Sequence, residues 1–230
     1  MDLLENSMGD PMSHWYYKHK FREILRSIRR YKEDFGSLSD VGSGSAVFSQ
    51  ELSKLYSESK FNLIDINYTS EQISKSTAQM KYTKNIEPAD IFLLTDVLEH
   101  IENANDFFKQ ICDFGKENDL VIITVPAFMQ LWSGHDVFLK HFRRYTKKSL
   151  INELRDMPIE ILEIKYLYQT LFLPAYLYRK IFGSKSSSQL KKNNRTIDLF
   201  LNSLLKFEYY SKLKLPFGIS ILLIAKVRKR

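Results

Sequence analysis

Short apolar runs and helically spaced apolar residues alternate through the first half of the chain. Apolar runs predict four buried strands, at residues 37–41, 61–65, 90–96 and 120–125, and a weaker pattern predicts another around 80–83. Helical spacing predicts helices at residues 46–56, 69–78 and from about 105. Apolar strands that alternate with helices are typical of a parallel sheet covered on both faces, so the predicted fold class is a doubly wound α/β sheet.

The same patterns continue on either side of this segment. An apolar stripe predicts a helix at residues 14–31, and apolar runs predict strands at 159–168 and 217–227. We therefore divide the chain into a lead-in with a helix (1–34) and one domain (35–230), which holds a helical insertion (about 169–212).

A glycine-rich turn follows the first predicted strand. Asp40, Gly42 and Gly44 stand just before a helix, and Asp65 ends the second strand. Glycines let a ligand approach the backbone, and a helix start offers it unpaired N–H groups. Because parallel strands end at one edge of the sheet, Asp65 can accept the hydroxyls of a ribose there. A nicotinamide dinucleotide is disfavoured, because Val47 replaces the third glycine of its fingerprint.

Four segments, in this order and spacing, resemble the class I S-adenosylmethionine-dependent methyltransferases of the small-molecule type. They are Asp40–Gly44, Asp65, Thr95–Ile101 and Leu120–Pro126. The resemblance implies a Rossmann-like, seven-stranded, mostly parallel sheet with an antiparallel last strand, and S-adenosylmethionine as cofactor. It assigns cofactor binding to Asp40, Gly42, Gly44, Asp65, Ile66, Asp96 and Val97, and it gives His100 a structural role.

Two positions depart from this family's pattern. Ala46 replaces the third glycine of the first motif. The acid that usually follows the third strand is missing from the region where we expect it, at Gln79, Met80 or Lys81. The adenine contacts are therefore not assigned.

The connection after the fifth strand carries the candidate catalytic residues. From Pro126 to Tyr145 it resembles a subgroup of bacterial methyltransferases with the pattern P…LWS.HD….H.RRY. A histidine beside an acid can remove an acceptor's proton near neutral pH, so His135 is the first candidate for the base, followed by Asp136 and His141. Substrate binding is assigned to Trp132, Arg143 and Arg144, and no metal ligand is assigned. The alternative is a salt-bridged network that shapes the connection, formed by His135, Asp136, Arg143 and Arg144.

Charge and composition bear on the acceptor and the partners. The formal net charge of +7 favours an anionic partner. The uncharged, aromatic stretch 166–178 predicts a cap on the sheet, a dimer face, a lid over a greasy substrate or a membrane-facing surface. We expect in-line O-methylation of a small-molecule or lipid-linked acceptor, with peripheral membrane contact and a homodimer left open.

Two other functions stay open, an RNA or protein methyltransferase and a non-catalytic methyltransferase-like subunit. Nucleic acid is not the expected partner, because no basic stretch carries aromatic residues placed for base stacking. A cytoplasmic location is expected, since the chain has one cysteine and no basic residue before Lys18, unlike a signal peptide.

Overall fold

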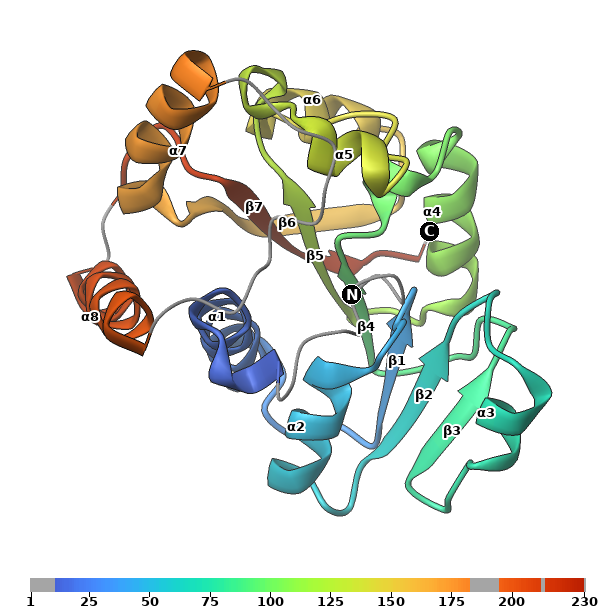
Figure 1. The fold of residues 1–230 in the computed structure, drawn as a ribbon. Helices are drawn as coiled ribbons and strands as arrows, with labels where there is room; N and C mark the ends of the chain where they lie inside the picture. Colours follow the sequence, from blue (N-terminus) through green and yellow to red (C-terminus); the bar gives the residue numbers. More distant parts are fainter. Residues whose placement is uncertain (1–10, 183–194, 212–213, 230) are drawn as a thin grey trace.

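The computed structural model describes residues 11–182, 195–211 and 214–229, in which a seven-stranded sheet has the order β3-β2-β1-β4-β5-β7-β6 (Figure 1). The strands are β1 (Ser37–Val41), β2 (Lys60–Ile64), β3 (Met80–Thr83), β4 (Ile91–Thr95), β5 (Leu120–Pro126), β6 (Ile159–Leu167) and β7 (Ser220–Val227). β1 to β5 pair in parallel, whereas β7 is antiparallel to β5 and β6. The predicted fold class, with its antiparallel last strand, is confirmed.

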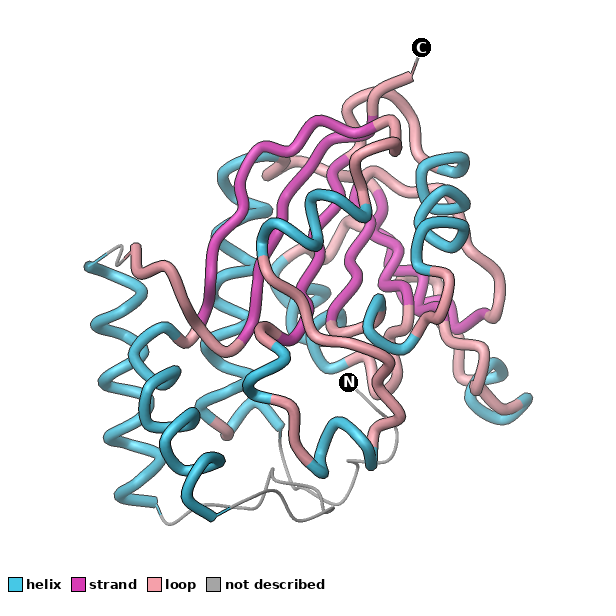
Figure 2. The backbone as a smooth tube through the Cα atoms, turned by 90° about the horizontal axis from the view of Figure 1, so that it is seen from above, coloured by secondary structure: helices cyan, strands magenta, loops and turns pink. Residues whose placement is uncertain are grey.

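Helices cover both faces of the sheet (Figures 1 and 2). The α-helices are α1 (Trp15–Tyr31), α2 (Val47–Leu55), α3 (Ser70–Ser74), α4 (Ala104–Phe114), α5 (Gly134–Phe138), α6 (Lys147–Glu153), α7 (Gln169–Phe182) and α8 (Arg195–Ser211). Short 3-10 turns are η2 (Pro11–Ser13), η3 (Leu98–His100) and η4 (Met129–Leu131). Buried residues of α1, α2 and α8 pack in one apolar cluster, and those of α4 and α6 pack in another.

Two elements differ from the sequence prediction. The helix expected at 69–78 is α3, which ends at Ser74, because the chain turns back and the N–H of Thr77 donates to the carbonyl of Met80. The connection after β5 contains η4 and the short helix α5, which the sequence analysis did not predict. Residues 1–10 of the lead-in and 183–194 of the insertion lie outside the described residues.

The helices α7 and α8 lie between β6 and β7 in sequence and are joined by Glu208. Its carboxylate accepts hydrogen bonds from the N–H groups of Gln169 and Thr170 at the start of α7, both at 3.0 Å. α8 also packs against α1. α8 thus contacts both α1 and α7 (Figure 1). Among the described residues, no helix is long and apolar enough to cross a membrane.

Candidate functional site

The glycine turn between β1 and α2 is fastened to the end of β2. The N–H groups of Gly42 and Ser43 both donate to the carbonyl of Ile64, at 2.8 and 3.0 Å. Gly42 and Gly44 have φ angles of +71° and +52°, in the left-handed region that favours glycine. A Cβ atom on Gly42 would lie 2.7 Å from Cγ2 of Val97, so this position has no room for a side chain.

The carboxylate of Asp65 lies directly against this turn. Its Oδ2 accepts a hydrogen bond from the N–H of Gly44 at 3.0 Å, and its Oδ1 accepts one from the N–H of Asn67 at 2.9 Å. Two predicted site residues from neighbouring strand ends are therefore in contact. The backbone of the turn holds this carboxylate in one orientation.

A cavity of about 700 Å³ opens beside the turn and is called the first cavity below. Five of the seven predicted cofactor residues line it: Gly42, Asp65, Ile66, Asp96 and Val97. Gly44 does not line this cavity, but its N–H donates to Asp65, which does. Asp40 is buried away from the cavity, where its Oδ2 accepts a 2.6 Å hydrogen bond from Ser49, and burial raises its pKa to about 6. Asp40 thus connects β1 to α2.

Residues after β3 and from α4 complete the first cavity. Its wall includes Lys84, Asn85, Ile86, Phe107 and Gln110. The expectation that Gln79, Met80 or Lys81 occupies the position after the third strand is wrong, because β3 begins at Met80 and ends at Thr83. The predicted strand, at 80–83, has the observed bounds, so counting onward from its end would have identified this wall.

Asp96 follows β4 and connects the site to α1. Its carboxylate pairs with the fully buried ammonium of Lys20 and accepts a 3.0 Å hydrogen bond from Thr124. Burial acts to raise the pKa of Asp96, but the charge of Lys20 outweighs it and lowers that pKa to about 2. The sequence analysis missed Lys20, although it lies on the apolar stripe of the helix, three residues after Tyr17 and four before Ile24.

A second cavity, of about 510 Å³, adjoins the first, because Asp96 and His100 line both. Apolar and aromatic side chains from α1, α2, α7 and α8 form much of its wall, among them Trp15, Tyr16, Tyr17, Phe48, Leu171, Tyr178 and Leu201. Charged or titratable side chains also border it: Glu99, His135, His141, Arg144 and Arg179. The sequence analysis gave no site role to Glu99 or to the aromatic run at the start of α1.

Two of the three predicted bases, His135 and His141, border the second cavity. Burial lowers the pKa of His135 below its ordinary value of 6.5. Asp136 opposes this shift, while the charges of Arg144 and Arg179 add to it. The imidazole of His135 is therefore neutral at pH 7 and can accept a proton.

The third predicted base, Asp136, is the centre of a fully buried network. Its carboxylate accepts two hydrogen bonds from the guanidinium of Arg144, at 2.7 and 3.1 Å, and one from the N–H of Ser133 at 2.8 Å. The Nδ1 of His141 lies 2.9 Å from its Oδ1. Burial acts to raise the pKa of Asp136, but the contacts with His141 and Arg144 hold it well below the ordinary value. These contacts argue against Asp136 as a base and for a role in orienting His141.

Of the three predicted substrate residues, Arg144 borders the second cavity, whereas Trp132 and Arg143 do not. Arg143 pairs with Glu153 at 3.0 Å and donates to the carbonyl of Glu102 at 2.5 Å. The alternative of a salt-bridged network is thus present in altered form, because Arg144 holds Asp136 while Arg143 joins a different acid.

Comparisons with known proteins agree with this geometry. The sequence profile of a methyltransferase domain family matches residues 13–163. No curated protein matches the sequence significantly. Similar solved structures include the [4+2]-cyclase SpnF, with a TM-score of 0.58, 13% identity, and coverage of 91% of this chain and 81% of that one. The plantazolicin methyltransferase BpumL in complex with S-adenosylhomocysteine has a TM-score of 0.56, 10% identity and coverage of 95% and 86%.

A methyltransferase from Archaeoglobus fulgidus, described as S-adenosylmethionine-dependent, has a TM-score of 0.54, 16% identity and coverage of 92% and 98%. At such identities these likenesses show the fold. The profile match, by contrast, spans more than half of the chain. The chain therefore belongs to the methyltransferase domain family, as the resemblance to the class I enzymes predicted.

Proposed function

We propose that this protein transfers a methyl group from S-adenosylmethionine to a hydroxyl group of a small, largely apolar acceptor. The observation that carries this proposal is the junction of two cavities at Asp96 and His100. One cavity has the glycine turn and an acid suited to a ribose, and the other has an apolar wall with histidines. A donor in the first cavity and an acceptor in the second would meet at this junction.

The first cavity suits the nucleoside of S-adenosylmethionine. A carboxylate held as Asp65 is can accept both hydroxyls of a ribose. The side chains of Ile66, Ile86 and Phe107 offer apolar surface to an adenine ring. The solved structure of BpumL contains S-adenosylhomocysteine, which supports the same choice of cofactor here.

The second cavity suits the acceptor and the proton transfer. The sulfonium of S-adenosylmethionine supplies an already activated methyl group. The protein must then align the acceptor oxygen in line with the carbon–sulfur bond and remove its proton. His135 is the residue we propose for the proton, since it borders the cavity and its lowered pKa keeps it neutral.

The surface of α7 and α8 favours an acceptor carried by lipid. Large apolar side chains are exposed on both helices: Leu173, Leu177, Tyr178, Ile181, Ile197, Leu199, Phe200, Phe207 and Tyr210. Exposed apolar residues on a chain with a formal net charge of +7 suit an anionic membrane. Co-sedimentation with anionic liposomes tests this contact, and a Leu177→Ser/Phe200→Ser variant should reduce it. Equal sedimentation of both proteins would contradict membrane contact through these helices.

Calorimetry with S-adenosylhomocysteine and methylation assays test the proposed function. Asp65→Ala should weaken S-adenosylhomocysteine binding by roughly 10- to 100-fold, because charged hydrogen bonds contribute about 1.5–3 kcal/mol. His135→Ala should keep this affinity and lose turnover with phenols and lipid-linked sugars as acceptors.

Absence of S-adenosylhomocysteine binding by the unaltered protein would instead favour a non-catalytic methyltransferase-like subunit. RNA or peptide acceptors in the same assay test the other alternative. A neighbour that forms a complex with the activator Trm112 makes a protein partner worth including.

A further inference from the structure

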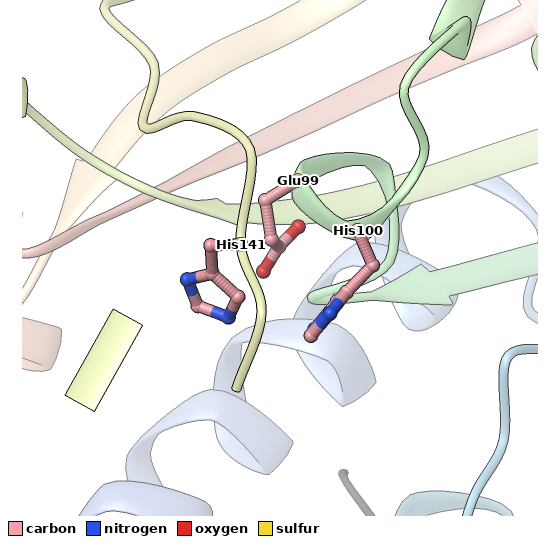
Figure 3. Close-up of side chains that lie close together, drawn as sticks. All are labelled: Glu99, His100 and His141. Atoms are coloured by element: carbon pink, nitrogen blue, oxygen red, sulfur yellow. The ribbon is translucent and has the colours of Figure 1, made fainter. Parts of the chain in front are cut away.

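Glu99, His100 and His141 bring three potential metal ligands together where the two cavities meet (Figure 3). One ligand atom from each residue lies within 4.8 Å of the other two. In the view of Figure 3 the Glu99 carboxylate lies above the two neighbouring imidazole rings. All three residues border the second cavity, and His100 borders both, so an ion held there would face the proposed acceptor.

The carboxylate of Glu99 has no hydrogen-bond partner within the described part of the chain, although the charges of Lys20 and Arg144 lie near enough to act on it. The side chain is fully buried, and neither of its oxygens accepts or donates a hydrogen bond. The neighbouring acids Asp96 and Asp136 contact Lys20 and Arg144. A buried carboxylate without donors is costly unless it takes up a proton or holds a cation.

Backbone and side-chain contacts fix the three residues relative to one another. The N–H of Phe142 donates to the carbonyl of Glu99 at 2.8 Å, which ties the chain beside His141 to η3. The ring centroids of His100 and His141 are 4.5 Å apart, and the two ring planes are nearly perpendicular. Because Nδ1 of His141 bonds Asp136, Nε2 is the atom left to ligate. A carboxylate behind a histidine is the usual way in which a metal-binding imidazole is oriented.

We propose that Glu99, His100 and His141 bind a divalent transition-metal ion of the Zn²⁺ type, with an open coordination position toward the second cavity. Two imidazoles and one carboxylate are a donor set of catalytic zinc and non-haem iron sites. Ligand atoms at about 2.1 Å from one ion lie at most about 4.2 Å from each other. The three ligand atoms here lie within 4.8 Å of one another, so a small side-chain rotation would bring them all into contact with one ion.

The role of this site rests on the proposed function, and it gives a physical reason for a hydroxyl acceptor such as a phenol or an alcohol. A Zn²⁺-type ion that coordinates the acceptor oxygen lowers the pKa of its hydroxyl. His135 takes the proton, the oxygen attacks the sulfonium methyl group, and the electrons of the carbon–sulfur bond return to sulfur. The products are the methyl ether, S-adenosylhomocysteine and one proton.

Metal titration of the whole, tag-free chain after treatment with EDTA tests the site without turnover. Calorimetry with Zn²⁺ and visible absorption with Co²⁺ should both report one ion per chain. Glu99→Gln, which keeps the shape and removes the charge, and His141→Asn should each weaken Zn²⁺ binding at least 100-fold. His135→Asn is the matched control, because this histidine borders the same cavity outside the cluster, and it should keep the Zn²⁺ affinity. Circular dichroism confirms that each variant is folded.

The same samples titrated with S-adenosylhomocysteine separate this inference from the proposed function. Equal Zn²⁺ binding by the unaltered protein and Glu99→Gln, or no binding by either, would overturn the metal site. If S-adenosylhomocysteine binds in that case, the proposed function stands without the metal. If Zn²⁺ binds with the expected loss in Glu99→Gln but S-adenosylhomocysteine does not bind, the metal site stands and the proposed function fails.

Discussion

The two cavities meet at one point but are built from different parts of the chain. The first is bordered by the glycine turn and by the ends of β2, β3 and β4, which come together because parallel neighbours end at one edge of the sheet. The second is assembled from side chains between Trp15 and Ser220, on α1, α2, α5, α7, α8 and the segments between them. Backbone geometry defines the first cavity, whereas the second depends on buried charge pairs, Lys20–Asp96 between distant segments and Arg144–Asp136 within one connection.

The largest effect is expected where a buried charge pair supports the second cavity. Arg144→Met leaves the fully buried Asp136 without its cation, so the free energy of unfolding should fall by roughly 3–5 kcal/mol, measured by urea denaturation. Arg143→Met is the control, because its pair with Glu153 is partly exposed and should contribute less than about 1 kcal/mol. Similar losses in the two variants would mean that the buried network does not support this region.

A side chain added to the glycine turn tests the backbone geometry of the first cavity. Gly42→Ala forces a residue with a Cβ atom to φ +71° and against Val97, so we expect a loss of about 2 kcal/mol of stability and weaker S-adenosylhomocysteine binding. The double variant Gly42→Ala/Val97→Ala should recover the part of the lost stability that the contact with Val97 causes. Gly36→Ala is the control, since its added Cβ would lie 3.4 Å from the nearest atom, on Asp90. A neutral Gly42→Ala would show that the turn is not constrained.

The difference between the two cavities explains how much of this molecule could be predicted from the sequence. Strands, the sheet and the contact of the turn with Asp65 follow from apolar runs and from the shared edge of parallel strands, which are local or topological patterns. The strand β3 was predicted with its observed bounds, but the wall after it was misplaced because the family's acid was sought at the start of this strand and not after its end. For the second cavity, the sequence indicated the histidines of one connection but could not show that Asp136 would be enclosed by Arg144.

Lys20 and Glu99 show why some charged residues of the site were not predicted from the sequence. Both are charged residues buried by segments remote in sequence, and their partners or lack of partners emerge only from tertiary packing. Lys20 meets Asp96, 76 residues later, while Glu99 meets no hydrogen-bond partner in the described structure. A periodic pattern reports which face of a helix is buried, and it does not report which charge lies opposite.

The pH dependence of methylation tests the role of His135 in the second cavity. The expected effect is smaller than those of the two variants above. His135 acts in its neutral form, and its pKa is lowered from 6.5, so kcat/KM should be constant near neutral pH and fall only below pH 6.5. Below the pKa the loss should approach tenfold per pH unit. S-adenosylhomocysteine affinity measured over the same range is the control and should not follow this profile. A midpoint above pH 6.5 would assign the proton transfer to another group.

The smallest effect is expected at Ala46, which replaces a family glycine in the turn. Its φ of +56° costs a residue with a Cβ atom about 1–2 kcal/mol, which Ala46→Gly would relieve. Two terms oppose this gain: glycine loses about 0.5–1 kcal/mol more conformational entropy on folding, and removing a buried methyl group costs about 0.8 kcal/mol. Urea denaturation should therefore show a change below about 1 kcal/mol, with unchanged S-adenosylhomocysteine affinity. A larger gain would mean that strain, rather than packing, dominates this end of the turn, and that the backbone of the first cavity is less relaxed than its hydrogen bonds to Ile64 indicate.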